Sequence, residues 1–183
     1  MVNKALAGNV IEFKGISDRI CLVAIRLNKK CQVNIIQVYA PTSSYDDEMV
    51  ENFYSQVSTT IEMCKGNNTF VIGDFNGKVG QRITGETTLG KFGLGDRNGR
   101  GQMIVDFASR NELKVMNTFF QKSLHKKWTW KAPNGSVKNE IDYVMAKRPT
   151  TVTDVSVFTK ANVGSDHRLV VGKVKIDTYH DKK

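Results

Sequence analysis

The sequence has few cysteines and no long hydrophobic run, and both shortages exclude classes of protein. Its three cysteines, Cys21, Cys31 and Cys64, are odd in number and lack the spacing of zinc ligands. We therefore expect neither a disulfide framework nor a zinc site, and we expect reduced thiols inside the cell. No apolar stretch approaches the ~18 residues of a membrane span, and the first residues lack the apolar core of a signal peptide. These features predict an intracellular protein of the nucleus or cytoplasm.

Acidic residues are also in short supply. The chain has 27 Lys and Arg residues against 18 Asp and Glu residues, which gives a formal net charge of +9. Such an excess suits a polyanionic partner such as nucleic acid, although a basic, solvated surface has the same composition. With 183 residues, of which 40% are hydrophobic, the chain is long enough for one substantial core. We expect one domain over residues 1–176 and a disordered tail over 177–183.

Hydrophobic periodicity predicts a mixture of strands and helices. Two β-branched runs, 19–27 and 31–39, flank a polar turn and predict a hairpin. After Pro41, capping residues are followed by apolar residues at helical spacing from Val50 to Ile61, which predicts an amphipathic helix over the sheet. The other expected elements are a helix over about 101–111 and strands over 69–75, 113–117, 152–158 and 168–176, with a hairpin from Trp128 to Met145 around Asn134 and Gly135.

Candidate contacts to a polyanion come from two further places in the sequence. The glycine-rich segment 77–101 carries Arg97 and Arg100, and we interpret it as a flexible basic flap. A surface loop whose glycines serve only its turns is the alternative. Trp128 and Trp130 lie two residues apart and are placed to stack on a base. A packing role for at least one of these tryptophans is the competing interpretation.

The segment Gly73-Asp74-Phe75-Asn76 ends a buried run and carries the first candidate for chemistry. Side chains two apart on a strand share a face, so Asp74 and Asn76 are predicted to reach one spot while Phe75 enters the core. An Asp-x-Asn pair also initiates turns by bonding to local backbone. Both interpretations of the pair stand at this point.

A second candidate pair joins Asp142 and His167. Asp142 lies in an apolar run, and a buried carboxylate needs a cationic or donor partner. An aspartate next to a histidine holds the imidazole in one tautomer and stabilises its charged form. His167 lies where a loop meets a strand, with Asp166 beside it, whereas His125 is in a lysine-rich connector and His180 is in the tail. We predict that Asp142 contacts His167; a purely structural histidine is the alternative.

Together these residues supply hard oxygen donors and one imidazole. No cluster of thiolates or histidines is present in the sequence, so the set favours Mg²⁺ or Mn²⁺ over Zn²⁺. Phosphodiester hydrolysis fits such a set: a metal neutralises charge on the phosphoryl oxygens, a carboxylate aims or deprotonates water, and His167 handles protons or developing charge. The expected partner is nucleic acid, with DNA favoured over RNA.

The chain resembles the endonuclease/exonuclease/phosphatase superfamily, which includes DNase I, and more closely the endonuclease domain of RTE-type retrotransposons. The motifs that carry the resemblance are Ile-Ser-Asp-Arg-Ile at 16–20, Gln-Val-Tyr-Ala-Pro-Thr at 37–42, Lys-Phe-Gly-Leu-Gly at 91–95 and Gly-Ser-Asp-His at 164–167. The resemblance implies an α/β (α+β) fold, a four-layer sandwich of two mixed β-sheets flanked by helices, with a divalent-metal site at the sheet rim. It also implies a role for each matched residue: Asp74 at the metal and the attacking water, Asn76 orienting that water, Tyr39 on the phosphate, Asp166 by the metal and Asp142 supporting His167.

The sequence departs from this family at its beginning. Family members open with a strand that ends in asparagine, followed by a Gln-Glu-Thr motif whose glutamate is the principal metal ligand, and neither occurs before Val10. We therefore expect the C-terminal portion of the module, with unpaired sheet edges and weak or absent nuclease activity. A non-catalytic module that binds nucleic acid or protein is the alternative, and a phosphatase acting on small phosphoesters is a third possibility.

Overall fold

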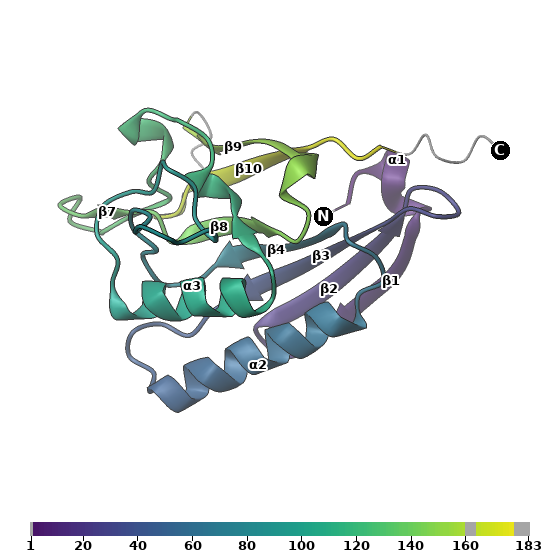
Figure 1. Cartoon of the computed structure of the whole chain (residues 1–183), viewed down its shortest axis with the longest axis horizontal. Helices are drawn as coiled ribbons and strands as arrows, with labels where there is room; N and C mark the ends of the chain where they lie inside the picture. Colours follow the sequence, from purple (N-terminus) through teal and green to yellow (C-terminus); the bar gives the residue numbers. More distant parts are fainter. Residues whose placement is uncertain (1, 160–163, 178–183) are drawn as a thin grey trace.

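The structure is a computed structural model that describes residues 2–159 and 164–177 (Figure 1). Its largest element is a six-stranded sheet with the strand order β1-β2-β3-β4-β8-β5. Strands β3 and β4 run parallel, and the other neighbours run antiparallel. The strands of this sheet are β1 (Val10–Gly15), β2 (Ile20–Arg26), β3 (Gln32–Tyr39), β4 (Thr69–Asp74), β5 (Lys114–Val115) and β8 (Asp142–Ala146).

The predicted hairpin near the start of the chain is confirmed. Strands β2 and β3 pair in unbroken register from Ile20 opposite Val38 to Arg26 opposite Gln32. A parallel partner cannot follow β3 through a tight turn, so the chain crosses over through a helix before it returns as β4. This crossover places the carboxyl ends of β3 and β4 side by side.

Two helices cover one face of the six-stranded sheet (Figure 1). Helix α2 (Asp47–Met63) begins where the Asp46 carboxylate accepts the Met49 N–H at 2.8 Å. Helix α3 (Gly99–Arg110) is capped by Asn98, so it begins two residues before the predicted start. The side chains that seal this interface are buried and follow the helical spacing expected from the sequence: Val50, Phe53, Tyr54, Val57 and Ile61 from α2, and Ile104, Phe107 and Ala108 from α3.

The opposite face of the large sheet packs against a two-stranded sheet of β9 (Val152–Phe158) and β10 (Leu169–Val174). A second apolar cluster lies between them, with members from both sheets. The α+β class and the mixed main sheet are confirmed. Both long helices lie on the same side of the molecule, so the described residues build three layers in the order helices, large sheet and small sheet, where four were expected (Figure 1).

Three other predictions change in detail. The expected strand 113–117 is shortened to β5, because a 3₁₀ turn, η1 (Met116–Thr118), follows it at once. The hairpin around Gly135 has only the two-residue strands β6 (Trp130–Lys131) and β7 (Lys138–Asn139), and its second arm continues into the large sheet as β8. Of the predicted tail, 178–183 lies outside the described residues. The remaining short elements are α1 (Lys4–Ala7), η2 (Leu124–Lys126) and η3 (Pro149–Thr151).

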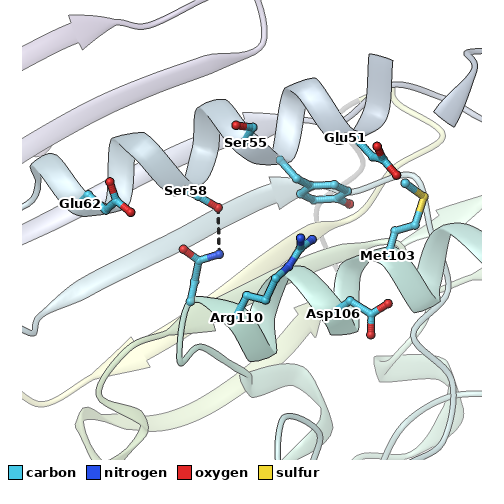
Figure 2. A pocket seen from close by; sticks show the side chains of 9 residues that line it. Glu51, Ser55, Ser58, Glu62, Met103, Asp106 and Arg110 are labelled. Carbon is cyan, nitrogen blue, oxygen red and sulfur yellow. Dashed lines mark hydrogen bonds between the residues drawn. The ribbon is translucent and has the colours of Figure 1, made fainter. Parts of the chain in front are cut away.

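An open groove of about 730 Å³ lies between α2 and α3 (Figure 2). The Asn111 amide donates to the Ser58 hydroxyl at 2.9 Å and ties the two helices together at one end. Glu51, Glu62 and Asp106 line the groove, with Arg110 as its one lining cation. This groove lies on the helical side and contains none of the sequence-predicted site residues. No helix among the described residues is long and apolar enough to cross a membrane.

Candidate active site

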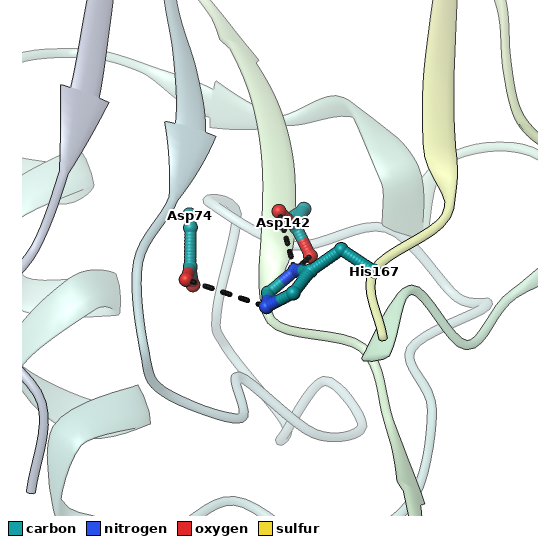
Figure 3. Close-up of side chains that lie close together, drawn as sticks. All are labelled: Asp74, Asp142 and His167. Atoms are coloured by element: carbon teal, nitrogen blue, oxygen red, sulfur yellow. Dashed lines mark hydrogen bonds and ion pairs between the residues drawn. The ribbon is translucent and has the colours of Figure 1, made fainter. Parts of the chain in front are cut away.

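Two aspartates meet at the edge of the large sheet where β4 ends and β8 begins. The antiparallel register of these strands places Asp74 directly opposite Asp142. His167 reaches the same spot from the segment that leads into β10. In that segment its backbone pairs with the backbone of Trp130 as a single antiparallel β-bridge. Figure 3 shows the three side chains converging from three separate parts of the chain. The fold therefore unites residues that are far apart in sequence.

Gly73 makes this approach possible. Its φ is +142°, a conformation that L-residues with a side chain rarely adopt. A Cβ at this position would lie 1.9 Å from the Val38 carbonyl oxygen of the neighbouring strand. Glycine therefore lets β4 lie against β3 immediately before Asp74, and a larger residue would move the site.

The imidazole of His167 lies between the two carboxylates. Its Nδ1 is 3.0 Å from Asp142 Oδ2 and 3.3 Å from Oδ1, and its Nε2 is 3.9 Å from Asp74 Oδ2. The predicted contact between Asp142 and His167 is thus confirmed. One donor atom from each of the three residues lies within 4.8 Å of the others, and all three side chains are half-buried. This spacing suits a single bound cation.

Asp142 is held in place by two polar side chains that the sequence patterns did not reveal. Thr129 Oγ1 accepts the backbone N–H groups of Ile141 and Asp142 at 3.0 and 3.1 Å. The Asn117 amide donates to the Asp142 carbonyl at 3.0 Å and accepts the Val144 N–H at 2.9 Å. It thus forms the two hydrogen bonds with β8 that a peptide group of a neighbouring strand would form. Neither residue has a diagnostic spacing, because each acts through contacts that only the fold creates.

Electrostatics at the site favour a cation. Burial, with the nearby Asp142 carboxylate, raises the pKa of Asp74 to about 6, although the Asn76 N–H bond opposes the rise. Among the described residues no Lys or Arg lies within ion-pair distance of Asp74 or Asp142. Among the described side chains that can carry a positive charge, only His167 lies within ion-pair distance of the two carboxylates, and a divalent ion would relieve the repulsion between them.

The prediction that Asp74 and Asn76 share a strand face is wrong. Strand β4 ends at Asp74, and Asn76 has a φ of +49°, in the left-handed region. The Asn76 N–H donates to Asp74 Oδ1 at 2.9 Å, which is the turn-forming alternative, while Phe75 is buried as expected. The Asn76 amide donates to the Ala40 carbonyl at 2.8 Å, so it links the ends of β3 and β4 behind the site.

Asp166 stands apart from the three-residue cluster. Its Oδ2 accepts the indole N–H of Trp130 at 2.7 Å, and this bond is the main cause that holds the pKa of the exposed carboxyl below its ordinary value. The half-buried Trp130 is therefore anchored through its nitrogen. Trp128 packs differently, because the Arg168 guanidinium lies 3.1 Å from its ring centroid. Both tryptophans thus contact neighbouring charged residues in the structure.

The two arginines expected in a flexible flap are engaged within the protein. Arg97 forms a two-pronged ion pair with Glu86, at 2.8 and 2.7 Å, and also donates to the Val79 carbonyl at 2.8 Å. Arg100 binds Asp47 at 2.7 Å and the backbone carbonyl of Tyr45. Val79 and Leu89 of the same segment are buried in the hydrophobic core. The loop is therefore anchored to the domain, and both arginine side chains are largely shielded from solvent.

An apolar groove of about 410 Å³ opens between the large sheet and β10 and ends beside Asp142 and Arg168. Strand β10 pairs only with β9 in the described part of the chain, so its other edge carries no strand. Leu169 and Val174 on this strand are 53% and 48% exposed. In the described residues, β10 therefore combines one edge without a paired strand with exposed apolar side chains.

Comparison with known proteins shows the family and the fold of the chain. A family model described as endonuclease-reverse transcriptase matches residues 33–171. Craniofacial development protein 2 of Bos taurus and that of Tragulus javanicus are each 34% identical to the chain over 181 residues. The match covers 96% of this chain but only 30% and 31% of those proteins, so the chain spans less than a third of the length of these curated relatives.

Solved structures with the same fold include the endonuclease domain of TRAS1, a telomere-specific non-LTR retrotransposon. Its TM-score is 0.66 at 13% identity, with 96% of this chain and 72% of that chain covered. The AP endonuclease LMAP from Leishmania major has a TM-score of 0.65 at 11% identity, with 90% and 57% covered. At such low identity these matches show the fold alone.

Proposed function

Because the chain belongs to the endonuclease-reverse transcriptase family, as its motifs indicate, we propose that it hydrolyses phosphodiester bonds of nucleic acid with the help of a divalent metal. The observation that carries this proposal is the convergence of Asp74, Asp142 and His167 within 4.8 Å at the sheet edge. The sequence contains no Gln-Glu-Thr motif, so turnover by these 183 residues is expected to be low.

The side chains divide the work according to their contacts. Asp142, through its 3.0 Å bond to Nδ1, holds the His167 ring so that Nε2 faces Asp74. Nε2 then gives or takes a proton, or stabilises charge, on the side where a phosphoryl group would lie. Asp74, once ionised, aims or deprotonates the attacking water.

A metal fits this donor set, and Mg²⁺ or Mn²⁺ fits best. The Asp74 carboxylate would hold the ion, and Asp166, whose Oδ2 accepts the Trp130 N–H, would contribute through its other oxygen. Magnesium is commonly held by one or two protein carboxylates together with waters and substrate phosphates, so a short ligand set is sufficient. When bound, the ion neutralises charge on the phosphoryl oxygens.

The substrate we propose is DNA in preference to RNA. The net charge of +9 favours a polyanion of either kind. Two proteins with this fold are named as a retrotransposon endonuclease domain and an AP endonuclease. Their names support a nucleic-acid substrate for this chain.

A plasmid-nicking assay in Mg²⁺ or Mn²⁺ tests the proposal. We expect slow conversion of supercoiled to open-circular plasmid that disappears with EDTA and with either His167→Ala or Asp74→Asn. His125→Ala is the matched control, because His125 is exposed and lies outside the cluster. Nicking that survives both site substitutions would come from a contaminant and would contradict the proposal.

A second candidate is a module that binds nucleic acid without cutting it. The observation that favours it is the bond between Asp166 and Trp130, which engages a third carboxylate outside the three-residue cluster. This candidate predicts salt-sensitive DNA binding that persists in Asp74→Ala, with no nicking by the unsubstituted protein.

A further inference from the structure

An arginine lies between two tyrosine rings at the edge of the site. The Arg19 guanidinium carbon is 5.3 Å from the ring centroid of Tyr39 and 5.1 Å from that of Tyr45. Tyr39 is the last residue of β3 and pairs in register with Asp74, so the arginine and the two tyrosines lie next to the candidate active site. Tyr45 comes from the segment between β3 and α2.

Arg19 holds the two rings rather than facing solvent. Its two terminal nitrogens donate to the Tyr39 carbonyl at 3.4 Å and to the Tyr45 hydroxyl at 3.1 Å. The Arg19 side chain is only 18% exposed. Arg100 donates to the backbone carbonyl of Tyr45 and also binds Asp47. Because these contacts already order the segment that carries Tyr45, binding a ligand there would cost less conformational entropy.

The rings themselves remain accessible. Tyr39 is 48% exposed and Tyr45 is 36% exposed, although both contact a cation. Aromatic rings that are both exposed and fixed are suited to stacking against flat ligands, and every nucleobase offers such a face. Because Tyr39 is the neighbour of Asp74, a base stacked here would belong to a nucleotide close to the phosphodiester at the site.

We propose that Tyr39 and Tyr45 form a stacking subsite for an unpaired nucleobase of the substrate strand, with Arg19 as the positioning residue for both rings. The inference rests on the proposed nucleic-acid substrate and adds a contact to the base, whereas the family resemblance implies only a phosphate contact for Tyr39. It requires a single-stranded or locally opened strand, because bases in a closed duplex have no free face.

Fluorescence anisotropy with a short single-stranded oligonucleotide in EDTA tests the subsite without any cleavage. Tyr45→Ala is expected to weaken binding roughly tenfold, within the range of one base–aromatic stack. Tyr45→Trp is expected to bind at least as tightly as the unsubstituted protein. Phe13→Ala is the matched control, since Phe13 is a 76% exposed aromatic on β1, and it should bind unchanged. Circular dichroism verifies that each variant is folded.

An abasic oligonucleotide of equal length separates stacking from phosphate contact. The unsubstituted protein and Tyr45→Ala are expected to bind it equally. Equal loss on both oligonucleotides, or no loss on either a DNA or an RNA strand with bases, overturns the inference. Arg19→Gln should reproduce part of the Tyr45→Ala loss on the base-containing strand only. Because no metal is present, a failure of nicking leaves this result unaffected, so the two proposals fail separately.

Discussion

The Nδ1 atom of His167 lies 3.0 Å from Asp142 Oδ2, while Nε2 of the same ring faces Asp74 at 3.9 Å. An ionised Asp142 accepts the Nδ1 proton and leaves Nε2 free for chemistry on the Asp74 side. A ring held at one nitrogen by a carboxylate is suited to proton transfer at the other, since both its tautomer and its orientation are set.

Replacing Asp142 by asparagine tests that arrangement. An amide can occupy the same space but favours the wrong tautomer or leaves the ring unsupported, so we expect Asp142→Asn to lower Mg²⁺-dependent nicking by about a hundred- to ten-thousand-fold. Rates from plasmid nicking are compared with those of Asp154→Asn, a carboxylate on β9 that pairs with Lys122. Similar rates for the two variants would contradict the role of Asp142.

Gly73→Ala is expected to destabilise the domain severely. The alanine would have to adopt a positive φ of +142°, and its Cβ would lie 1.9 Å from the Val38 carbonyl oxygen. We expect a loss of about 3 kcal/mol or more in the free energy of unfolding, measured by urea denaturation. Gly15→Ala, at an open position, is the control and should change stability by less than about 0.5 kcal/mol. Equal stability of the two variants would show that β3 and β4 do not approach so closely.

The ion pair between Arg97 and Glu86 is expected to order the segment before α3. Its two bonds of 2.8 and 2.7 Å are partly shielded from solvent, with side chains 12% and 11% exposed. Arg97→Ala should cost about 1–3 kcal/mol and hasten cleavage of the segment in limited proteolysis. Lys91→Ala removes an exposed cation from the same segment as a control. A weakened affinity for DNA with unchanged stability would instead favour the flap interpretation.

Stability is expected to fall as the pH rises through neutrality. Burial raises the pKa of Glu140 from 4.5 to about 7, against the influence of Lys127, whose Nζ lies 3.7 Å from Oε2, and of Asn117. A carboxyl whose pKa is higher in the folded state favours folding while protonated, so this stability is present below pH 4.5 and is lost as the pH rises through 7. Asp74 acts in the same direction between 3.8 and about 6.

Glu140→Gln separates the two groups. The amide cannot ionise, so urea unfolding of this variant should lose the Glu140 contribution, which spans pH 4.5 to about 7, while the Asp74 contribution between 3.8 and about 6 should remain. An unchanged pH profile would mean that Glu140 is ionised at neutral pH in the folded protein.

The strands and helices were predictable where the sequence pattern is repeated over several residues. The hairpin of β2 and β3 and the buried face of α2 follow directly from alternation and helical spacing. Asn76 was misplaced because one left-handed residue ends the strand, and a local turn overrode the period of two.

The three-residue cluster of the candidate site was predictable, whereas the contacts of the other candidate residues were not. The bond between Asp142 and His167 followed from the need of a buried carboxylate for a partner. The engagement of Arg97 and Arg100 was not predictable, because Glu86 lies in an irregular segment and Asp47 lies in the first turn of a helix that is distant in sequence, so only the fold brings these pairs together. The role of Asn117 along the edge of β8 also depends on register alone.

The most direct test of the account is a titration of the protein with Mn²⁺, followed by electron paramagnetic resonance, at a pH above 6 where Asp74 is ionised. Mn²⁺ is a paramagnetic stand-in for Mg²⁺ with the same preference for oxygen ligands. The account predicts one site that is lost in Asp74→Ala and retained in Asp106→Ala, which removes a carboxylate from the groove between the helices. Absence of any bound Mn²⁺, or a site that survives Asp74→Ala, would contradict it.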